Sequence, residues 1–427
     1  MEPAERMLRE IDQLRDSLVE LTQELIRIPT LNPPGANYLQ ICEFLRRRLL
    51  QSGFEVELMR AVGAPADSDR YPRYNLLARR KGALPGDCVH FNSHTDVVQV
   101  GEGWTVDPFA GQVRGERLFG RGACDMKGGL AASIIAVEAF TACCPNFAGA
   151  IEVSATADEE SGGFGGVAWL AERGWFSPQR VQHVIIPEPL NKDRICLGHR
   201  GVWWAEIETK GRIAHGSMPF LGDCAVRHMG AVIAEMEQSL FPALAQTRTG
   251  MPVVPPEAKQ PSLNINSIHG GEPEQDCDFS GFPAPCVPDR CRMIVDRRFV
   301  AEESLAEVRS ELSDLLQRVK ESRPGMGVEL RELFSVLPVL TEKDAPVVRS
   351  VGKAIRSVFD KAPDYVVSPG TYDQKHIDRI GRLKNCIAYG PGRIDLAHQP
   401  DEWIGIGDML DSAKVMALTL VDLLKPG

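Results

Sequence analysis

The first apolar residues of the chain recur at the spacing of an amphipathic helix. They follow one another in steps of four and three residues and so share one helix face; they are Met7, Ile11, Leu14, Leu18, Leu21 and Leu25. Pro29 and a turn at residues 32–35 end the pattern. A coiled coil would give the same spacing, but three heptads without continuation are more typical of a helix packed on a sheet. We therefore predict one long helix here, followed by a second over residues 38–50.

Strand-like and helix-like segments alternate in the next part of the chain. The strand-like runs cover residues 88–92, 150–156 and 182–186, and the helix-like runs cover 130–142 and 166–174. This alternation is typical of α/β proteins. We expect a doubly wound mixed sheet.

Polar residues follow each of these predicted strands. His94 and Asp96 come after the first strand, residues 158–160 are acidic and follow the second, and Glu188 follows the third. Open α/β sheets carry their sites at the carboxyl ends of strands. The sequence therefore predicts a functional site at this edge.

Around residue 198 the pattern changes to that of a smaller α+β segment. Strands are predicted over 202–210, 263–268 and 291–299, with a helix over 223–240 and a proline-rich surface loop over 242–261. After Ser304 the helical patterns resume, and the chain is expected to return to its first domain; these later elements are helices over 305–320, 345–360 and 409–424 and a strand over 385–388.

The length of the chain supports this division into two domains. A chain of 427 residues exceeds one ordinary hydrophobic core. We assign residues 1–199 and 305–427 to one domain and residues 200–304 to an inserted domain.

Composition and charge narrow the class of protein. Apolar residues make up 43% of the chain and charged residues 25%, as in ordinary globular proteins. We find no apolar run near the roughly 18 residues of a membrane span, and residues 1–28 do not resemble a secretory signal. The net charge of -10 argues against nucleic acid and anionic membranes as partners. Eleven scattered cysteines indicate neither a disulfide framework nor a zinc finger. We expect a soluble, cytoplasmic protein.

The segment over residues 120–129 is the most specific local signal. Its four glycines surround Asp125 immediately before a predicted helix. A glycine-rich phosphate cradle is the alternative, but the spacing matches neither the dinucleotide-binding nor the P-loop pattern. We interpret the segment as tight backbone that places Asp125.

Imidazoles and carboxylates elsewhere suit a hydrolytic metal site. Asp96 follows His94 by two residues, so its carboxylate can accept the second ring N–H and fix the tautomer. The neighbours Glu159 and Glu160 allow one carboxylate to bind metal while the other faces a bound water. A second histidine, His398, lies near the end of the sequence. Each feature alone is also common on ordinary surfaces and turns.

Together these motifs resemble the M20 family of metallopeptidases and deacylases. The family includes acetylornithine deacetylases, succinyl-diaminopimelate desuccinylases, aminoacylases and carboxypeptidase G. The resemblance covers almost the whole chain and rests on five motifs in order: HTD at 94–96, GRGxxDMKGG at 120–129, DEESGG at 158–163, PEP at 187–189 and AHQPDE at 397–402.

The resemblance implies a role for each polar residue of the first domain. It implies two divalent ions, zinc by default with cobalt or manganese as alternatives. His94 and Glu188 would bind one ion, Glu160 and His398 the other, and Asp125 would bridge them. Glu159 resembles the general base and acid, and Asp96 the residue that orients His94.

The inserted segment resembles the lid and dimerisation domain of the family, which implies a homodimer that acts on a small molecule. His215 would stabilise the oxyanion across the dimer. Arg298, or Arg297 one residue away, would bind a substrate carboxylate. Asn264 and Thr371 are weaker candidates for substrate contact.

The sequence departs from the family pattern after Thr371. Members often have small residues and an arginine here, whereas this chain has Tyr372, Gln374 and Lys375. We expect these residues to alter the usual acyl-amino-acid preference. The proline-rich loop and the tryptophan pair at 203–204 are further candidates, although a tryptophan pair on a strand is more often a packing feature.

Three functions remain open from the sequence. The first is a metal-dependent hydrolase that removes an acetyl, formyl or succinyl group from a small carboxylate-bearing amine. The second is an aminohydrolase that releases ammonia from an aromatic or amidine-like carbon. The third is a binding protein on a hydrolase scaffold, which the presence of Glu159 disfavours.

Overall fold

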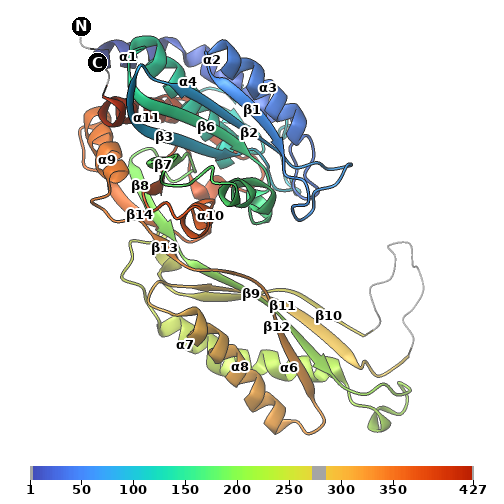
Figure 1. Cartoon of the computed structure of the whole chain (residues 1–427). Coiled ribbons are helices and arrows are strands. Elements are labelled where there is room, and N and C mark those ends of the chain that lie inside the picture. The colour runs from blue at the N-terminus through green and yellow to red at the C-terminus, as the bar shows by residue number, and fades with distance from the viewer. Residues whose placement is uncertain (1–2, 272–284, 426–427) are drawn as a thin grey trace. The chain divides into compact units, whose positions relative to one another are not determined.

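The computed structural model describes residues 3–271 and 285–425, and these form two compact units (Figure 1). The first unit contains the chain up to Gly198, Leu340–Val366 and the chain from Tyr372 onward. The second contains His199–Val339 and Val367–Thr371. The chain therefore leaves the first unit and returns to it.

A mixed sheet forms the centre of the first unit, which confirms the predicted fold class. Within the described residues it has nine strands in the order β1-β2-β6-β3-β7-β15-β8-β13, and β14 pairs with β8. Strand β3 runs parallel to β6 and β7, whereas β1, β2 and β6 pair antiparallel. The strands are β1 Glu55–Arg60, β2 Tyr74–Lys81, β3 Leu84–His94, β6 Ala148–Thr156, β7 His183–Ile186, β8 Arg194–His199, β13 Val339–Leu340, β14 Asp364–Ser368 and β15 Cys386–Ala388.

Helices pack around this sheet (Figure 1). They are α1 Pro3–Gln13, α2 Arg15–Arg27, α3 Tyr38–Gln51, α4 Gly128–Cys143, α5 Trp169–Glu172, α9 Pro346–Phe359, α10 Gln374–Arg379 and α11 Ile406–Leu424. Helices α4 and α11 pack against each other and against β3 and β6. The segment Ala123–Cys143 is long and apolar enough to cross a membrane, but 83% of its most apolar window is buried inside the protein. Burial of this extent is typical of a core helix.

The prediction of one long N-terminal helix is wrong, because the chain bends at Leu14. This residue has φ -81° and ψ 8°, outside helical values, and it separates α1 from α2. Both helices still bury their apolar face against α4 and α11. The hydrophobic pattern continues through the bend, so the sequence pattern did not reveal it.

The second unit is a four-stranded antiparallel sheet with helices packed on it. The sheet order is β10-β11-β9-β12, and α6 packs on β9 and β11 while α8 packs on β12. The elements are β9 Gly201–Lys210, β10 Ser262–Gly270, β11 Arg290–Phe299, β12 Gly327–Val336, α6 Ala225–Glu235, α7 Phe241–Gln246 and α8 Leu305–Ser322.

This unit extends beyond the boundary predicted at residue 304. Strand β12 pairs with β9 along its whole length, so α8 and β12 belong with the inserted segment and the chain returns at Leu340. Helix α7 also occupies the start of the predicted loop over 242–261. Helical periodicity after Ser304 does not show which sheet the helix covers.

Ten cysteines lie in the described part of the chain, and all ten are free.

Candidate metal centre

The predicted site residues of the first unit follow three neighbouring parallel strands. His94 is the last residue of β3, Glu159 and Glu160 follow β6, and Glu188 follows β7. Because β3 lies between β6 and β7, their carboxyl ends meet at one edge of the sheet. The structure therefore places these residues at one edge of the sheet.

Glycines place Asp125 beside this edge. Asp125 lies in the turn η1 (Ala123–Lys127), which Gly122 introduces with a left-handed φ of 82°. At the start of α4, a side chain on Gly129 would lie 2.0 Å from the carbonyl oxygen of Pro187. The bare backbone of Gly129 thus lets α4 approach the strand end that carries Glu188.

Replacement of Gly129 by alanine is expected to destabilise the protein by about 1 to 3 kcal/mol, the usual cost of overpacking. The added methyl group meets a carbonyl oxygen that belongs to the backbone and cannot rotate away. Urea unfolding measures the change in the free energy of unfolding. Gly230→Ala is the matched control, since Gly230 lies inside α6 with nothing within 4 Å of the new methyl. It should stabilise α6 by up to about 1 kcal/mol; equal effects of the two changes would contradict the close approach.

The loop that carries His398 is held next to Asp125 by a small three-stranded sheet. Its strands are β4 Gln112–Arg114, β5 Arg117–Phe119 and β16 Trp403–Gly405. Glu402 precedes β16, and its Oε1 accepts the backbone N–H of Asp125 at 3.0 Å. Arg121 donates to the other carboxylate oxygen of Glu402 at 2.6 Å. Neither residue was predicted to have a role, although both lie inside the motifs.

Asp125 contacts both histidines through different oxygens. His94 Nε2 lies 3.0 Å from Asp125 Oδ1, and His398 Nε2 lies 3.5 Å from Asp125 Oδ2. His398 Nε2 is also 3.1 Å from Glu160 Oε1. Ligand atoms of His94, Asp125 and Glu160 all lie within 4.8 Å of one another, which suits a metal ion. A carboxylate with a histidine at each oxygen is also the arrangement that a bridging ligand needs.

The electrostatics of these acids favour a bound cation. Burial raises the pKa of Glu160 to about 7, and burial with the nearby Asp125 carboxylate holds the pKa of Glu188 well above its usual value. Hydrogen bonds to Asp125 and Glu160 raise the pKa of His398 to about 10. Crowded buried carboxylates are costly unless a positive charge compensates them. The donor set of imidazoles and carboxylates therefore fits a divalent metal.

Asp96 contacts more than the histidine it was predicted to orient. The ring Nδ1 of His94 lies 3.0 Å from the backbone oxygen of Asp96 and 3.5 Å from its carboxylate. The same carboxylate accepts the backbone N–H groups of Glu159 at 3.2 Å and Glu160 at 3.1 Å, and the side chain of Asn32 at 2.9 Å. Asp96 thus ties the end of β3 to the turn that carries both glutamates.

A buried ion pair between Arg73 and Asp158 supports the turn that carries the two glutamates. Asp158 precedes Glu159 with a left-handed φ of 64°, and its carboxylate accepts Arg73 Nε at 3.1 Å and Tyr38 Oη at 3.0 Å. Arg73 is 1% exposed. The roles of Arg73 and Tyr38 were not predicted from the sequence, because no local motif surrounds them.

Lys375 lies beside the predicted base. Its Nζ donates to Glu159 Oε1 at 2.7 Å, and its side chain is buried. The neighbours Tyr372 and Gln374 are buried as well, and Tyr372 Oη donates to Gln374 Oε1 at 2.6 Å. Those two residues therefore pack inside the first unit.

The remaining predicted residues lie in the second unit. His215 is exposed in the loop after β9, where Ser217 donates to its Nδ1. Asn264 is exposed on β10, and Thr371 is half-buried. Of the tryptophan pair, Trp203 is buried and Trp204 is 36% exposed.

The two adjacent arginines on β11 have different surroundings. Arg297 is 1% exposed and forms ion pairs with Glu303 and Glu311. Arg298 has a partly exposed guanidinium that pairs with Asp296 at 2.7 Å. Arg298 is thus the arginine of the pair that a ligand can reach.

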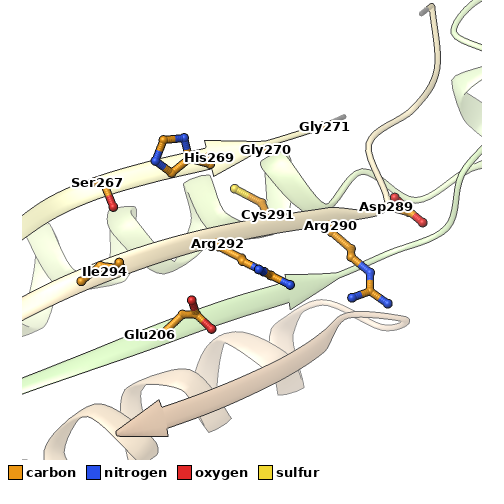
Figure 2. A pocket seen from close by; sticks show the side chains of 10 residues that line it. All are labelled: Glu206, Ser267, His269, Gly270, Gly271, Asp289, Arg290, Cys291, Arg292 and Ile294. Atoms are coloured by element: carbon orange, nitrogen blue, oxygen red, sulfur yellow. The ribbon is translucent and has the colours of Figure 1, made fainter. Parts of the chain in front are cut away.

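A groove of about 670 Å³ lies on the sheet of the second unit (Figure 2). Glu206, Arg290 and Arg292 extend over the sheet there, and His269 lies on the neighbouring strand β10. Arg292 pairs with Glu208 at 2.7 Å. None of the predicted metal ligands is among the residues that line this groove.

Comparison with known proteins extends the motif resemblance to most of the chain. Residues 90–422 match the peptidase family M20/M25/M40. A succinyl-diaminopimelate desuccinylase from Thioalkalivibrio sulfidiphilus is 30% identical over 401 residues, which cover 92% of this chain and 94% of that protein. Human carnosine dipeptidase 1 has a similar fold, with a TM-score of 0.79, 21% identity and coverage of 100% of this chain and 99% of that one. An M20 family metallo-carboxypeptidase from Sulfolobus solfataricus has a TM-score of 0.73 at 17% identity, covering 95% of this chain and 99% of that one.

Proposed function

Because this chain belongs to the peptidase family M20/M25/M40, and is therefore a hydrolase of amide-type bonds, we propose that it removes an acyl group from a small amine that carries a carboxylate. The observation that carries this proposal is the convergence of His94, Asp125 and Glu160 at one edge of the sheet. The desuccinylase relatives make an N-succinyl amino acid the first substrate to test, with N-acetyl and N-formyl amino acids next.

Two divalent ions are proposed at this centre, with zinc as the default and cobalt or manganese as alternatives. His94 and Glu188 would hold one, His398 and Glu160 the other, and Asp125 would bridge them. When bound, such ions polarise the substrate carbonyl and make a water molecule acidic near neutral pH. The two contacts of Asp125 with the histidines support this assignment.

Glu159 is proposed as the residue that moves the proton. It would accept a proton from the attacking water and return it to the leaving nitrogen, as general base and then general acid. Its attachment to Asp96 through the backbone and to Lys375 through the side chain supports a fixed position.

The second unit is proposed as a lid and dimerisation domain. In a homodimer, His215 of the partner subunit would donate to the oxyanion that forms on the substrate carbonyl. The exposure of His215 supports this role, since its side chain is free to meet another surface.

The ten free thiols suit a reducing compartment, so a cytoplasmic enzyme is proposed.

Product analysis tests the proposed reaction. The protein, loaded with zinc, cobalt or manganese, is incubated with N-succinyl, N-acetyl and N-formyl amino acids and with aminobenzoates. Release of a carboxylic acid and an amine in equal amounts would support a deacylase. Release of ammonia would favour the aminohydrolase alternative.

Replacement of Arg298 by methionine is expected to raise KM by about 10- to 100-fold and to change kcat by less than about threefold. The guanidinium would bind the substrate carboxylate away from the bond that is broken, so its loss weakens binding in the ground state and the transition state equally. Steady-state kinetics on the best substrate measures both constants. Arg292→Met is the matched control on the same strand, and it should leave KM unchanged. A fall in kcat alone would contradict this role of Arg298.

A further inference from the structure

Lys375 gives the predicted base a fixed partner that is far away in the sequence. It lies on the short helix α10, is 3% exposed, and donates from Nζ to Glu159 Oε1 at 2.7 Å. Within residues 3–271 and 285–425, it is the one Lys or Arg whose ion pair reaches an acid of the proposed centre. The contact therefore joins the C-terminal part of the chain to the turn after β6.

The surroundings of Lys375 hold it in place. Asp373, at the start of α10, accepts Asn92 Nδ2 of β3 at 2.9 Å and Thr156 Oγ1 of β6 at 3.5 Å. Asn92 Oδ1 in turn accepts the hydroxyl of Ser154 at 2.7 Å. All of these side chains are buried. The central strands of the sheet thus anchor the segment that presents the lysine.

A second contact ties the same helix to the other end of the glutamate turn. His376 Nε2 lies 2.6 Å from the backbone oxygen of Gly162. The turn over residues 159–162 is therefore held by α10 at Glu159 and again at Gly162.

The charge of Lys375 is kept by its acidic neighbours. Burial alone would lower the pKa of the ammonium, but Glu159 and Asp373 raise it above the ordinary lysine value. The ammonium donates to one oxygen of Glu159, and among the described residues no hydrogen bond reaches the other oxygen. One carboxylate oxygen is thus fixed while the other remains open for proton transfer.

We propose that Lys375 is a positioning residue, which holds the Glu159 side chain through one oxygen so that the other oxygen meets the water and the leaving nitrogen. This inference rests on the proposed role of Glu159 as the proton carrier. Lys375 itself touches neither substrate nor metal in this account.

The first experiment compares Lys375→Met with Lys375→Arg in the metal-loaded enzyme. The methionine variant is expected to lower kcat by about 100-fold with KM within about threefold of wild type, because proton transfer suffers and substrate binding does not. The arginine variant keeps the charge and should recover to within about tenfold of wild type. Metal content and calorimetric binding of the product carboxylate should be unchanged in both. Lys384→Met is the control, since Lys384 is exposed and pairs with Asp378 outside the centre.

A double variant separates positioning from direct contact. If Lys375 acts only through Glu159, E159Q/K375M should be no slower than E159Q, within about twofold. If the losses in kcat of E159Q and K375M multiply in the double variant, the inference is overturned, because Lys375 would then act on the substrate itself. Wild-type kcat in K375M, with a slow E159Q, would also overturn it and leave the proposed function intact. Full activity of E159Q would instead overturn the proposed function. Should K375M fail to fold in a thermal melt, K375Q and K375R in both backgrounds carry the same comparison.

Discussion

Replacement of Glu159 by glutamine is expected to lower kcat by about 10³-fold, while the bound metal remains. Glutamine has nearly the same shape, and the backbone N–H of residue 159 can still bond to Asp96, so the turn keeps its place. The amide cannot accept a proton from water or return it to the leaving nitrogen. The variant should therefore bind metal and substrate and yet turn over slowly. Steady-state kinetics with metal analysis of the same sample measures both quantities.

The matched control for this change is Glu172→Gln. Glu172 is exposed at the end of α5, lies outside the motifs and pairs with Arg173, so its replacement should leave kcat unchanged. Retention of more than about a tenth of the wild-type kcat in E159Q would contradict the role of Glu159 as proton carrier. Loss of metal together with activity would show that Glu159 is a metal ligand and not the base.

Replacement of Asp125 by alanine is expected to remove both ions and to lower kcat by on the order of 10³-fold or more. Its two oxygens face different histidines, so each proposed ion loses a ligand at once. Replacement of His398 by alanine should weaken the binding of one ion only, because His398 is proposed as a ligand of the ion that Glu160 also holds. Metal analysis after gel filtration measures the number of ions per chain.

The control for the Asp125 variant is Asp395→Asn. Asp395 is exposed and pairs with Arg393 near the His398 loop, so this change tests the loop without touching a ligand. It should keep the full metal content. Retention of one tightly bound ion in the Asp125 variant would contradict a bridging position and would place Asp125 on a single ion.

Strand-end residues of the site were predictable from the sequence, and the reason is geometric. Parallel strands β6, β3 and β7 are neighbours, so the polar residues that follow them must meet at one edge. The glycines around Asp125 also indicated close backbone approach, which Gly129 and Pro187 show.

Residues that support the site from a distance were not predictable. Glu402 holds the backbone at Asp125, Arg73 holds Asp158, and Lys375 holds Glu159. Each acts across a large sequence separation, and charged side chains usually lie on solvated surfaces. Only the tertiary fold shows that they are buried beside the centre.

Two features of the fold were missed for a related reason. A hydrophobic pattern indicates which face of a helix is buried but not whether the helix axis bends. The break at Leu14 therefore could not be predicted from the pattern. Helix α8 has the same kind of periodicity as the helices of the first unit, yet it covers the sheet of the second. The division at Leu340 depends on the pairing of β12 with β9.

The most direct test of the account is a titration of the metal-free protein with zinc, in which bound ions per chain and turnover of the best N-acyl substrate are recorded together. We predict that chelation abolishes turnover, that turnover returns as metal binds, and that it reaches its maximum at about two ions per chain. Turnover that survives complete removal of metal would contradict the central claim. So would stoichiometric metal binding with no hydrolysis of any substrate in the panel.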